Sequence, residues 1–314
     1  MKTLDYLGFD IGGTKCAVLR GNDAGQVAQR VEIPTGAPEE TLETLFAAAE
    51  GWQPVAAAGI SCGGPLDERT GVILSPPNLP GWDAIPIVRM VEERFGVPAA
   101  LRNDANAGAL AEWRFGAGRG VRNMVFLTFG TGMGAGLILN GRLYAGANGN
   151  AGEVGHWRLA EDGPMGYHKA GSFEGFVSGG GLAQLAGRMA ADARRRGVAV
   201  PWADGIISAK TVAQAADAGD PTAQAVYTQC GERLGQALAL VIDCLNPERV
   251  VIGSIFQRSE KLLRPAMERV LRQECLPQTW EAVQIVPAQL GDRIGDLAAL
   301  SVAMERETGE EYEG

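Results

Sequence analysis

Short apolar runs broken by turn residues fill the first half of the chain, and longer stretches with helical periodicity fill the second half. The early runs predict strands at residues 4–10, 17–20, 27–33, 56–61, 98–102 and 124–129. Between them, the pattern predicts helices at residues 39–50, 86–95 and 104–115. The second half predicts helices at residues 173–196, 209–218, 222–245, 261–274 and 295–305, and strands at 249–252 and 283–286. Strands that alternate with helices indicate an α/β protein.

Two glycine-rich segments each follow a predicted strand. The first reads DIGGTK, residues 10–15, and the second reads FGTGMGAG, residues 129–136. The second satisfies the loose dinucleotide pattern G-x-G-x-x-A, but that pattern needs a helix directly behind it. Residues 137–144 instead read as a strand, an Asn-Gly turn and a returning strand. Both segments are therefore predicted to form a strand, a glycine turn and a second strand.

A glycine turn of this kind presents backbone N–H groups that can hold an anion. Neither segment matches G-x-x-x-x-G-K-[ST], which excludes a P-loop. A single such turn is more simply a tight hairpin, but two of them, each with Gly-Thr, favour phosphate binding. In the first, Thr14 adds a hydroxyl donor, Lys15 adds positive charge, and Asp10 is placed to hold Mg²⁺ directly or through water.

Composition narrows the class of protein. The 314 residues suffice for about two domains, and without a dividing linker we expect these to be interwoven. The net charge of -9 argues against a duplex-DNA surface, and the five cysteines lack C-x-x-C spacing, as expected of free thiols in a reducing compartment. No signal peptide or bilayer-long apolar run is present, so we expect a cytoplasmic enzyme. Residues 305–314 are acidic and are predicted to form a frayed tail.

Six short blocks occur in a fixed order along nearly the whole chain. They are DIGGTK at 10–15, NLPGW at 78–82, NDAN at 103–106, GTG at 130–132, GEVGH at 152–156 and LGDR at 290–293. In this ordered set the chain resembles the ROK family of bacterial sugar kinases and sugar-responsive repressors, within the superfamily of sugar kinases, actin and heat-shock chaperones. Each block alone is unspecific, whereas the ordered set is highly specific.

The resemblance implies a two-domain, actin-like ATPase (ribonuclease H-like) α/β fold with a cleft between the domains. The smaller domain is expected at residues 1–108 plus 293–314, with the C-terminal helix returning to it, and the larger domain at 109–292. It further implies ATP and Mg²⁺ as cofactors, a hexose or hexosamine as substrate and a homodimer, with no nucleic acid or membrane as partner.

The resemblance also implies roles for particular residues, which in isolation have simpler explanations. Asp104 would be the catalytic base, although on its own an Asp at that position is most simply a helix N-cap. Glu153 on its own is a solvated loop acid, Glu174 a first-turn helix carboxylate and His156 a structural histidine. Implied sugar contacts are Asn78, Asn103, Asp104, Glu153, His156 and Glu174. Implied nucleotide contacts are Asp10, Gly12, Gly13, Thr14, Lys15, Gly130, Thr131, Gly132 and Gly253, the last in a segment where Ser254 replaces a second glycine.

The chain departs from the family where a structural zinc ion is usually bound. The family segment G-x-x-C-x-C-G-x-x-G-C-x-E aligns with DGPMGYHKAGSFE, which places Met165, Tyr167 and Ser172 at the cysteine positions. A thioether, a phenol and a hydroxyl do not form a zinc site, so zinc is not expected. We expect this loop to be held by packing of Met165, Tyr167 and Phe173, with His156 released for the sugar.

The function implied is ATP-dependent phosphorylation of a hexose or N-acylhexosamine at the 6-hydroxyl, with an Asp as general base. The alternatives are a sugar-sensing repressor and a binding-only relative. Repressors of the family carry a helix-turn-helix before the first phosphate loop, and here nine residues precede Asp10. Asp104 and both glycine loops argue against a non-catalytic relative. The sequence does not identify the sugar: glucose is the default, and N-acetylglucosamine, N-acetylmannosamine, fructose, mannose and allose stay open.

Overall fold

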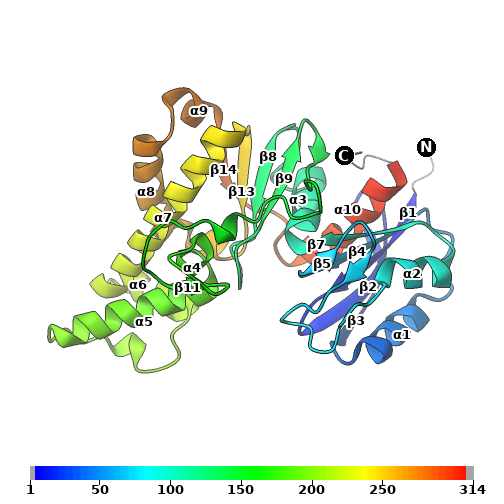
Figure 1. Ribbon diagram of the computed structural model, residues 1–314, viewed down its shortest axis with the longest axis horizontal. Coiled ribbons are helices and arrows are strands. Elements are labelled where there is room, and N and C mark those ends of the chain that lie inside the picture. Colours follow the sequence, from blue (N-terminus) through cyan, green and yellow to red (C-terminus); the bar gives the residue numbers. More distant parts are fainter. Residues whose placement is uncertain (1–3, 309–314) are drawn as a thin grey trace. The chain divides into compact units, whose positions relative to one another are not determined.

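The computed structural model of the protein describes residues 4–308 and divides the chain into two compact units (Figure 1). Unit 1 comprises Met1–Arg122, Gly136–Ala151 and Gln289–Gly314, and unit 2 comprises Asn123–Ala135 and Gly152–Ala288. The expected division at residues 108/109 and 292/293 differs from this one, which puts residues 109–122, 136–151 and 289–292 in unit 1. For helix α3 (Asp104–Phe115) the reason is that it packs against the C-terminal helix α10 (Ile294–Thr308), so both belong to unit 1.

Unit 1 is built on a five-stranded sheet with the order β3-β2-β1-β4-β7. Its strands are β1 (Asp5–Ile11), β2 (Lys15–Asn22), β3 (Val27–Pro34), β4 (Ala58–Cys62) and β7 (Ala99–Asn103). The first three pair antiparallel, while β4 runs parallel to both β1 and β7. All five strands were predicted from the apolar runs to within a few residues. The DIGGTK block begins at the end of β1, and the NDAN block begins at the end of β7.

Helices cover both faces of this sheet. On one face, Phe9 packs in the core with Phe46 of α1 (Pro38–Ala49) and with α2 (Ile87–Phe95). On the other face α10 approaches so closely that a Cβ atom at Gly59 would lie 2.9 Å from Cβ of Val302 and closer still to the α10 backbone. The alternation of side chains along β1 and β4 therefore buries both faces and fixes α10 against the sheet.

Two hairpins complete unit 1. The strands β5 (Leu66–Asp67) and β6 (Val72–Ile73) form one, and β9 (Ala135–Leu139) and β10 (Arg142–Leu143) form the other. Between β9 and β10, Asn140 has φ 55° and Gly141 has φ 80°, the left-handed conformation that two-residue hairpin turns require. The predicted Asn-Gly turn is confirmed, and with it the absence of a helix directly after the second glycine segment.

Unit 2 contains three parallel strands, β8 (Met124–Leu127), β13 (Arg249–Ile252) and β14 (Gln284–Pro287), which belong to a five-stranded sheet with the order β10-β9-β8-β13-β14. Its helices are α4 (Phe173–Phe176), α5 (Gly179–Arg195), α6 (Ala209–Asp217), α7 (Pro221–Leu245), α8 (Ile255–Glu274) and α9 (Pro277–Ala282). Short elements are β11 (Met165–Gly166), β12 (Lys169–Ala170) and the 3-10 turns Val154–His156 and Pro201–Ala203, and a third turn, Gly291–Arg293, lies in unit 1. Helices α7 and α8 pack closely because Gly231 and Gly235 have no side chain: a Cβ atom there would lie 2.5 and 2.7 Å from carbonyl oxygens of α8.

Three predicted element boundaries were wrong in detail. The helix expected at 173–196 is two helices, since Ser178 is extended and its hydroxyl accepts from the Gly181 N–H, which starts α5 anew. The helix expected at 261–274 begins at Ile255, with non-helical dihedrals at Ser259. The tail expected from residue 305 begins later, because α10 continues to Thr308 and buries Glu305; residues 309–314 lie outside the described part.

Candidate functional site

The first glycine segment lies in unit 1 as the predicted turn between β1 and β2. The Gly12 N–H donates to the Lys15 carbonyl at 3.2 Å and closes the turn. Within residues 4–308, the N–H groups of Gly13 and Thr14 have no hydrogen-bond acceptor in the protein. They are therefore the donors that this turn can offer to an anion.

Asn78 lies directly beside this turn. A Cβ atom at Gly13 would stand 2.7 Å from Cβ of Asn78 and closer still to its carbonyl oxygen, so only glycine fits. The neighbours Leu79 and Trp82 are buried, and the Trp82 indole donates to the Gly36 carbonyl at 3.1 Å. The NLPGW block thus anchors two apolar side chains in the core and leaves Asn78 exposed.

Asp10, near the end of β1, lies close to acidic and basic side chains, among them Asp296 and Arg30. Its pKa is raised to about 6, first because the carboxyl group is buried and next because the Asp296 carboxylate is near. Gly295 makes room for it: a Cβ atom there would lie 3.0 Å from the Asp10 carboxyl carbon. Lys15 does not bond to Asp10; its ammonium pairs with Glu32 at 3.0 Å.

The NDAN block forms the junction between β7 and α3, and the cap of α3 is not Asp104. The Asn103 side chain accepts from the Asn106 N–H at 2.7 Å and caps the helix. Asp104 is the first residue of α3, and it is exposed. The simpler explanation of Asp104 as the N-cap was wrong, since the preceding asparagine takes that role.

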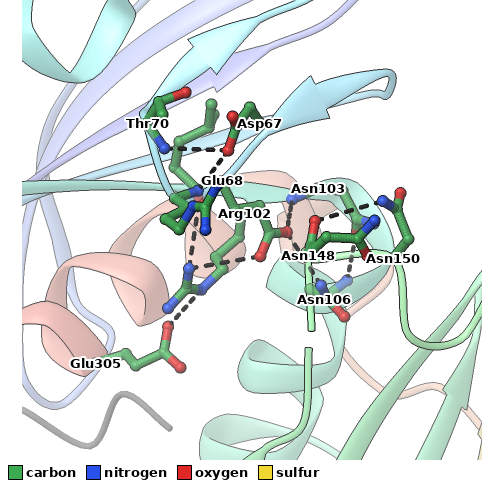
Figure 2. A network of polar contacts seen from close by, with 11 residues as sticks. Asp67, Glu68, Thr70, Arg102, Asn103, Asn106, Asn148, Asn150 and Glu305 are labelled. Carbon is green, nitrogen blue, oxygen red and sulfur yellow. Dashed lines mark hydrogen bonds and ion pairs between the residues drawn. The ribbon is translucent and has the colours of Figure 1, made fainter. Parts of the chain in front are cut away.

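A buried carboxylate that sequence reasoning missed lies beside this junction. Glu68 accepts from the Asn103 N–H at 2.9 Å and from the Asn106 Nδ2 at 3.1 Å. Figure 2 shows Arg102 between Glu68 and Glu305, with its guanidinium 3.5 Å from the first and 2.9 Å from the second. The only signal in the sequence was an acid next to the turn residues of the segment PLDERTG, which is also what a solvated loop looks like.

The second glycine segment lies in unit 2 and begins where β8 ends. The Thr128 N–H donates to the Gly134 carbonyl at 3.1 Å, and the Gly130 N–H donates to the Gly132 carbonyl at 3.0 Å. In the described part of the chain, no protein acceptor takes the N–H groups of Thr131 and Gly132. This turn is thus a second set of amides suited to an anion.

Glu174 contacts this second turn. Its Oε2 accepts from the Met133 N–H at 3.0 Å, and a Cβ atom at Gly132 would lie 2.8 Å from the same oxygen. The Ser172 hydroxyl caps the short helix α4 that carries Glu174 by accepting from the Gly175 N–H at 3.1 Å. Glu174 is therefore held in the first turn of α4, as predicted, and its carboxylate reaches the glycine turn.

The GEVGH block contacts the second glycine turn at the point where the turn leads into β9. The Ala135 N–H donates to the Gly152 carbonyl at 3.0 Å. Gly155 is pressed against the Met133 carbonyl, where no Cβ atom fits. Glu153 and His156 project from this block, with 3.9 Å between a Glu153 oxygen and the His156 Nε2.

The loop at the family's zinc position is held differently from what we expected. Phe173 is fully buried, but Met165 and Tyr167 are 48% and 60% exposed, so the predicted packing of those two residues was wrong. Instead, β11 and β12 pair as a hairpin, and the Gln184 amide bonds both the N–H and the carbonyl of Met165 at 2.9 Å. The Tyr167 ring meets His156 edge to face, with 5.0 Å between ring centroids.

Gly253 ends β13 and donates its N–H to the Leu127 carbonyl at 2.9 Å. Ser254 then starts α8, with its N–H bonded to the Gln257 side chain at 2.9 Å. The Gly179 N–H, at the start of α5, donates to the Gly130 carbonyl at 2.8 Å. The second glycine turn thus lies among the starts of two helices. Sequence reasoning predicted neither start, since α8 was expected only from residue 261 and α5 was merged into a helix from residue 173, although Ser178 followed by three glycines signals the start of α5.

The predicted site residues fall into two sets. Those in unit 1 are Asp10, Gly12, Gly13, Thr14, Lys15, Asn78, Asn103 and Asp104; those in unit 2 are Gly130, Thr131, Gly132, Glu153, His156, Glu174 and Gly253. Over residues 4–308 there is no cluster of three or more His, Cys, Asp or Glu side chains arranged to hold a metal ion. None of the helices described is both long and apolar enough to cross a bilayer.

Comparison with known proteins finds similarity along nearly the whole chain. The model of the ROK family matches residues 6–306. A glucokinase from Streptomyces coelicolor is 31% identical over 309 residues, which are 95% of this chain and 97% of the glucokinase. The crystal structure of a ROK hexokinase from Thermus thermophilus is similar with a TM-score of 0.83 and 31% identity, over 98% of this chain and 100% of the hexokinase.

A ROK family glucokinase from Streptomyces griseus, solved in complex with glucose and AMPPNP, has a TM-score of 0.75 and 30% identity. The match covers 97% of this chain and 100% of the glucokinase chain. The α/β, actin-like sugar kinase fold expected from the sequence is confirmed by these similarities.

Proposed function

The chain belongs to the ROK family, and from that premise we propose that it is an ATP-dependent sugar kinase that phosphorylates a hexose or N-acylhexosamine at its 6-hydroxyl. The observation that carries the proposal is at the start of α3. Because Asn103 caps the helix, the carboxylate of Asp104 is not used as the cap and lies exposed at the N-terminal turn.

Asp104 is proposed as the general base. A sugar hydroxyl is a weak nucleophile, so a carboxylate within hydrogen-bond distance accepts its proton as the oxygen attacks the γ-phosphate. One asparagine neighbour, Asn103, and the exposed Asn78 offer amide groups that both donate and accept, as each sugar hydroxyl does. Glu153, His156 and Glu174 are proposed as further sugar contacts.

The two glycine turns are proposed to hold the polyphosphate of ATP. The N–H groups of Gly13, Thr14, Thr131 and Gly132 have no protein acceptor in the described residues, so a bound phosphate would satisfy them. Binding of an ATP analogue by the Streptomyces griseus relative supports this assignment. Gly253 is proposed to lie near the nucleotide because it adjoins the second turn.

Mg²⁺ fits the chemistry of Asp10. Burial and the nearby Asp296 carboxylate raise the pKa of Asp10 to about 6, which means that its ionised form is less favoured than that of a solvent-exposed carboxylate. A hard divalent cation prefers carboxylate oxygens and would stabilise that form, held directly or through water. When bound, Mg²⁺ neutralises phosphate charge.

The test is ATP consumption measured with a panel of hexoses and hexosamines, starting from glucose because similar proteins are named glucokinases. We expect turnover with at least one sugar and no turnover with its 6-deoxy analogue. Asp104→Ala should abolish turnover while leaving sugar binding, measured by calorimetry, largely intact. If no sugar stimulates ATP consumption, the proposed function is wrong; if Asp104→Ala retains turnover, only the assignment of the base is wrong.

We also propose a homodimer, on the family resemblance, and sedimentation velocity measures it directly.

A further inference from the structure

The Glu68 side chain contacts three polar groups around the start of α3, and from this we propose that Glu68 is a positioning residue that aims Asn103 and Asp104 at the sugar. The inference rests on the proposed function, because it concerns the residues that function assigns to the sugar and the proton. Glu68 itself is not proposed to touch the substrate.

The contacts of Glu68 are directed at the N-terminal turn that carries Asp104. Its Oε1 accepts from the Asn103 N–H at 2.9 Å and from the Asn106 Nδ2 at 3.1 Å, while its Oε2 lies 3.5 Å from the Arg102 guanidinium. These three residues, which Figure 2 labels, belong with Asp104 to the five-residue stretch 102–106. One carboxylate therefore fixes the residue before Asp104 and the residue two positions after it.

Asn106 depends on this carboxylate. It is fully buried, and its Oδ1 has no hydrogen-bond partner among the described residues. Its Nδ2 donates to Glu68, and its N–H donates to the Asn103 side chain at 2.7 Å. Without Glu68, a buried amide group would lose its acceptor, which is costly, and the N-cap pair would lose its anchor.

The position of Glu68 is itself rigidly built. It follows the strand β5, and the Asp67 side chain accepts from the Arg69 and Thr70 N–H groups at 3.0 and 3.1 Å. Gly71 closes the turn by donating its N–H to the Asp67 carbonyl at 2.9 Å. A carboxylate on so well-ordered a turn can hold the start of α3 in one orientation.

Charge explains why an acid is needed there. The side chains of Glu68 and Glu305 are only 5% and 3% exposed, and Arg102 lies between them. The N-terminus of α3 carries a partial positive charge, which also favours an anion. A neutral side chain of the same size would leave the buried Arg102 guanidinium with less negative charge nearby, and it would leave the N–H donors with a weaker acceptor.

A cavity of about 590 Å³ within unit 1 is lined by Glu68, Arg102 and Glu305 among others. A molecule as small as formate fits such a volume. If Glu68 is shortened to alanine, an added carboxylate can enter and take over its hydrogen bonds. Chemical rescue therefore separates a positioning carboxylate from a residue that serves only to fill space.

The experiment compares Glu68→Gln and Glu68→Ala with the wild-type enzyme, using the sugar that the wild type phosphorylates. For Glu68→Ala we expect kcat to fall about 100-fold, the effect of a displacement near 1 Å in a reacting group. The KM for the sugar should rise, while the KM for ATP should stay close to the wild-type value. Glu68→Gln keeps one acceptor oxygen and should lose about tenfold in kcat. Sodium formate should restore part of the kcat of Glu68→Ala, and sodium chloride at equal ionic strength should not.

Glu112→Gln is the matched control. Glu112 is a fully buried carboxylate on the same helix, and it accepts from the Ala117 and Leu290 N–H groups at 2.8 and 3.0 Å. This variant should lower the melting temperature but keep the wild-type KM for the sugar and show no response to formate. The proposal is overturned if both Glu68 variants keep wild-type kcat and KM, or if folded Glu68→Ala does not respond to formate. Should the alanine variant fail to fold, Glu68→Gln decides alone. An inactive wild type would instead overturn the proposed function.

Discussion

Replacing Gly13 by alanine tests whether the first glycine turn and Asn78 act as one assembly. The added Cβ atom would lie 2.7 Å from Cβ of Asn78, whereas an ordinary contact begins near 3.4 Å. The two segments must therefore separate by about 0.7 Å, and the Asn78 carbonyl oxygen, which is closer still, demands more. Because Leu79 and Trp82 are buried, Asn78 cannot recede easily and the turn must move.

The strain from this overpacking should cost about 1–3 kcal/mol of unfolding free energy. The accompanying displacement, near 1 Å, should lower kcat/KM about 100-fold. Both KM values should rise, because the turn is assigned to ATP and Asn78 to the sugar. Steady-state assays with each substrate varied, and denaturation followed by circular dichroism, measure these effects.

Gly205→Ala is the control, since a Cβ atom at Gly205 meets nothing within 4 Å and the variant should behave as wild type. A Gly13→Ala enzyme with unchanged KM for both substrates would refute the reasoning. A rise in only one KM would show that the turn and Asn78 do not act together.

Three further predictions concern single contacts. Gly132→Val should raise the KM for ATP more than the KM for the sugar, because its Cβ atom would press on the Glu174 oxygen that accepts from the Met133 N–H and would displace the second glycine turn; the opposite order in steady-state kinetics would contradict the loop assignment. Gly59→Ala should lower the unfolding free energy by about 1–3 kcal/mol by pushing α10 from β4, and unchanged urea denaturation would count against that packing. Glu305→Gln should cost about 3–5 kcal/mol by weakening the buried pair with Arg102, and an unshifted urea midpoint would show that Glu68 alone suffices for Arg102.

Features fixed by neighbouring residues could be predicted from the sequence. The five strands of unit 1 followed from apolar runs, and the left-handed pair Asn140 and Gly141 followed from turn chemistry. The turn form of both glycine segments was correct for the same reason. The roles assigned to the site residues came from family resemblance, and they stay predictions until the variants are measured.

Features that depend on distant residues could not be predicted. Asn103 and Asp104 are both good N-caps, and the choice between them is tied to the hydrogen bond that the Asn103 N–H donates to Glu68, 35 residues earlier. Glu305 looked like part of an acidic tail, yet Arg102, 203 residues away, pairs with it and buries it. The exposure of Met165 and Tyr167 was missed because Gln184, on helix α5, holds the loop.

The sequence by itself determined the strands, the two glycine turns and the family, because periodicity, turn chemistry and ordered motifs are local properties of the chain. Only the tertiary structure decided which side chains share an environment: Gly13 with Asn78, Gly132 with Glu174, and Glu68 with the start of α3. The physical reason is that burial and hydrogen-bond partners depend on packing between elements, and a linear pattern does not encode which elements will meet.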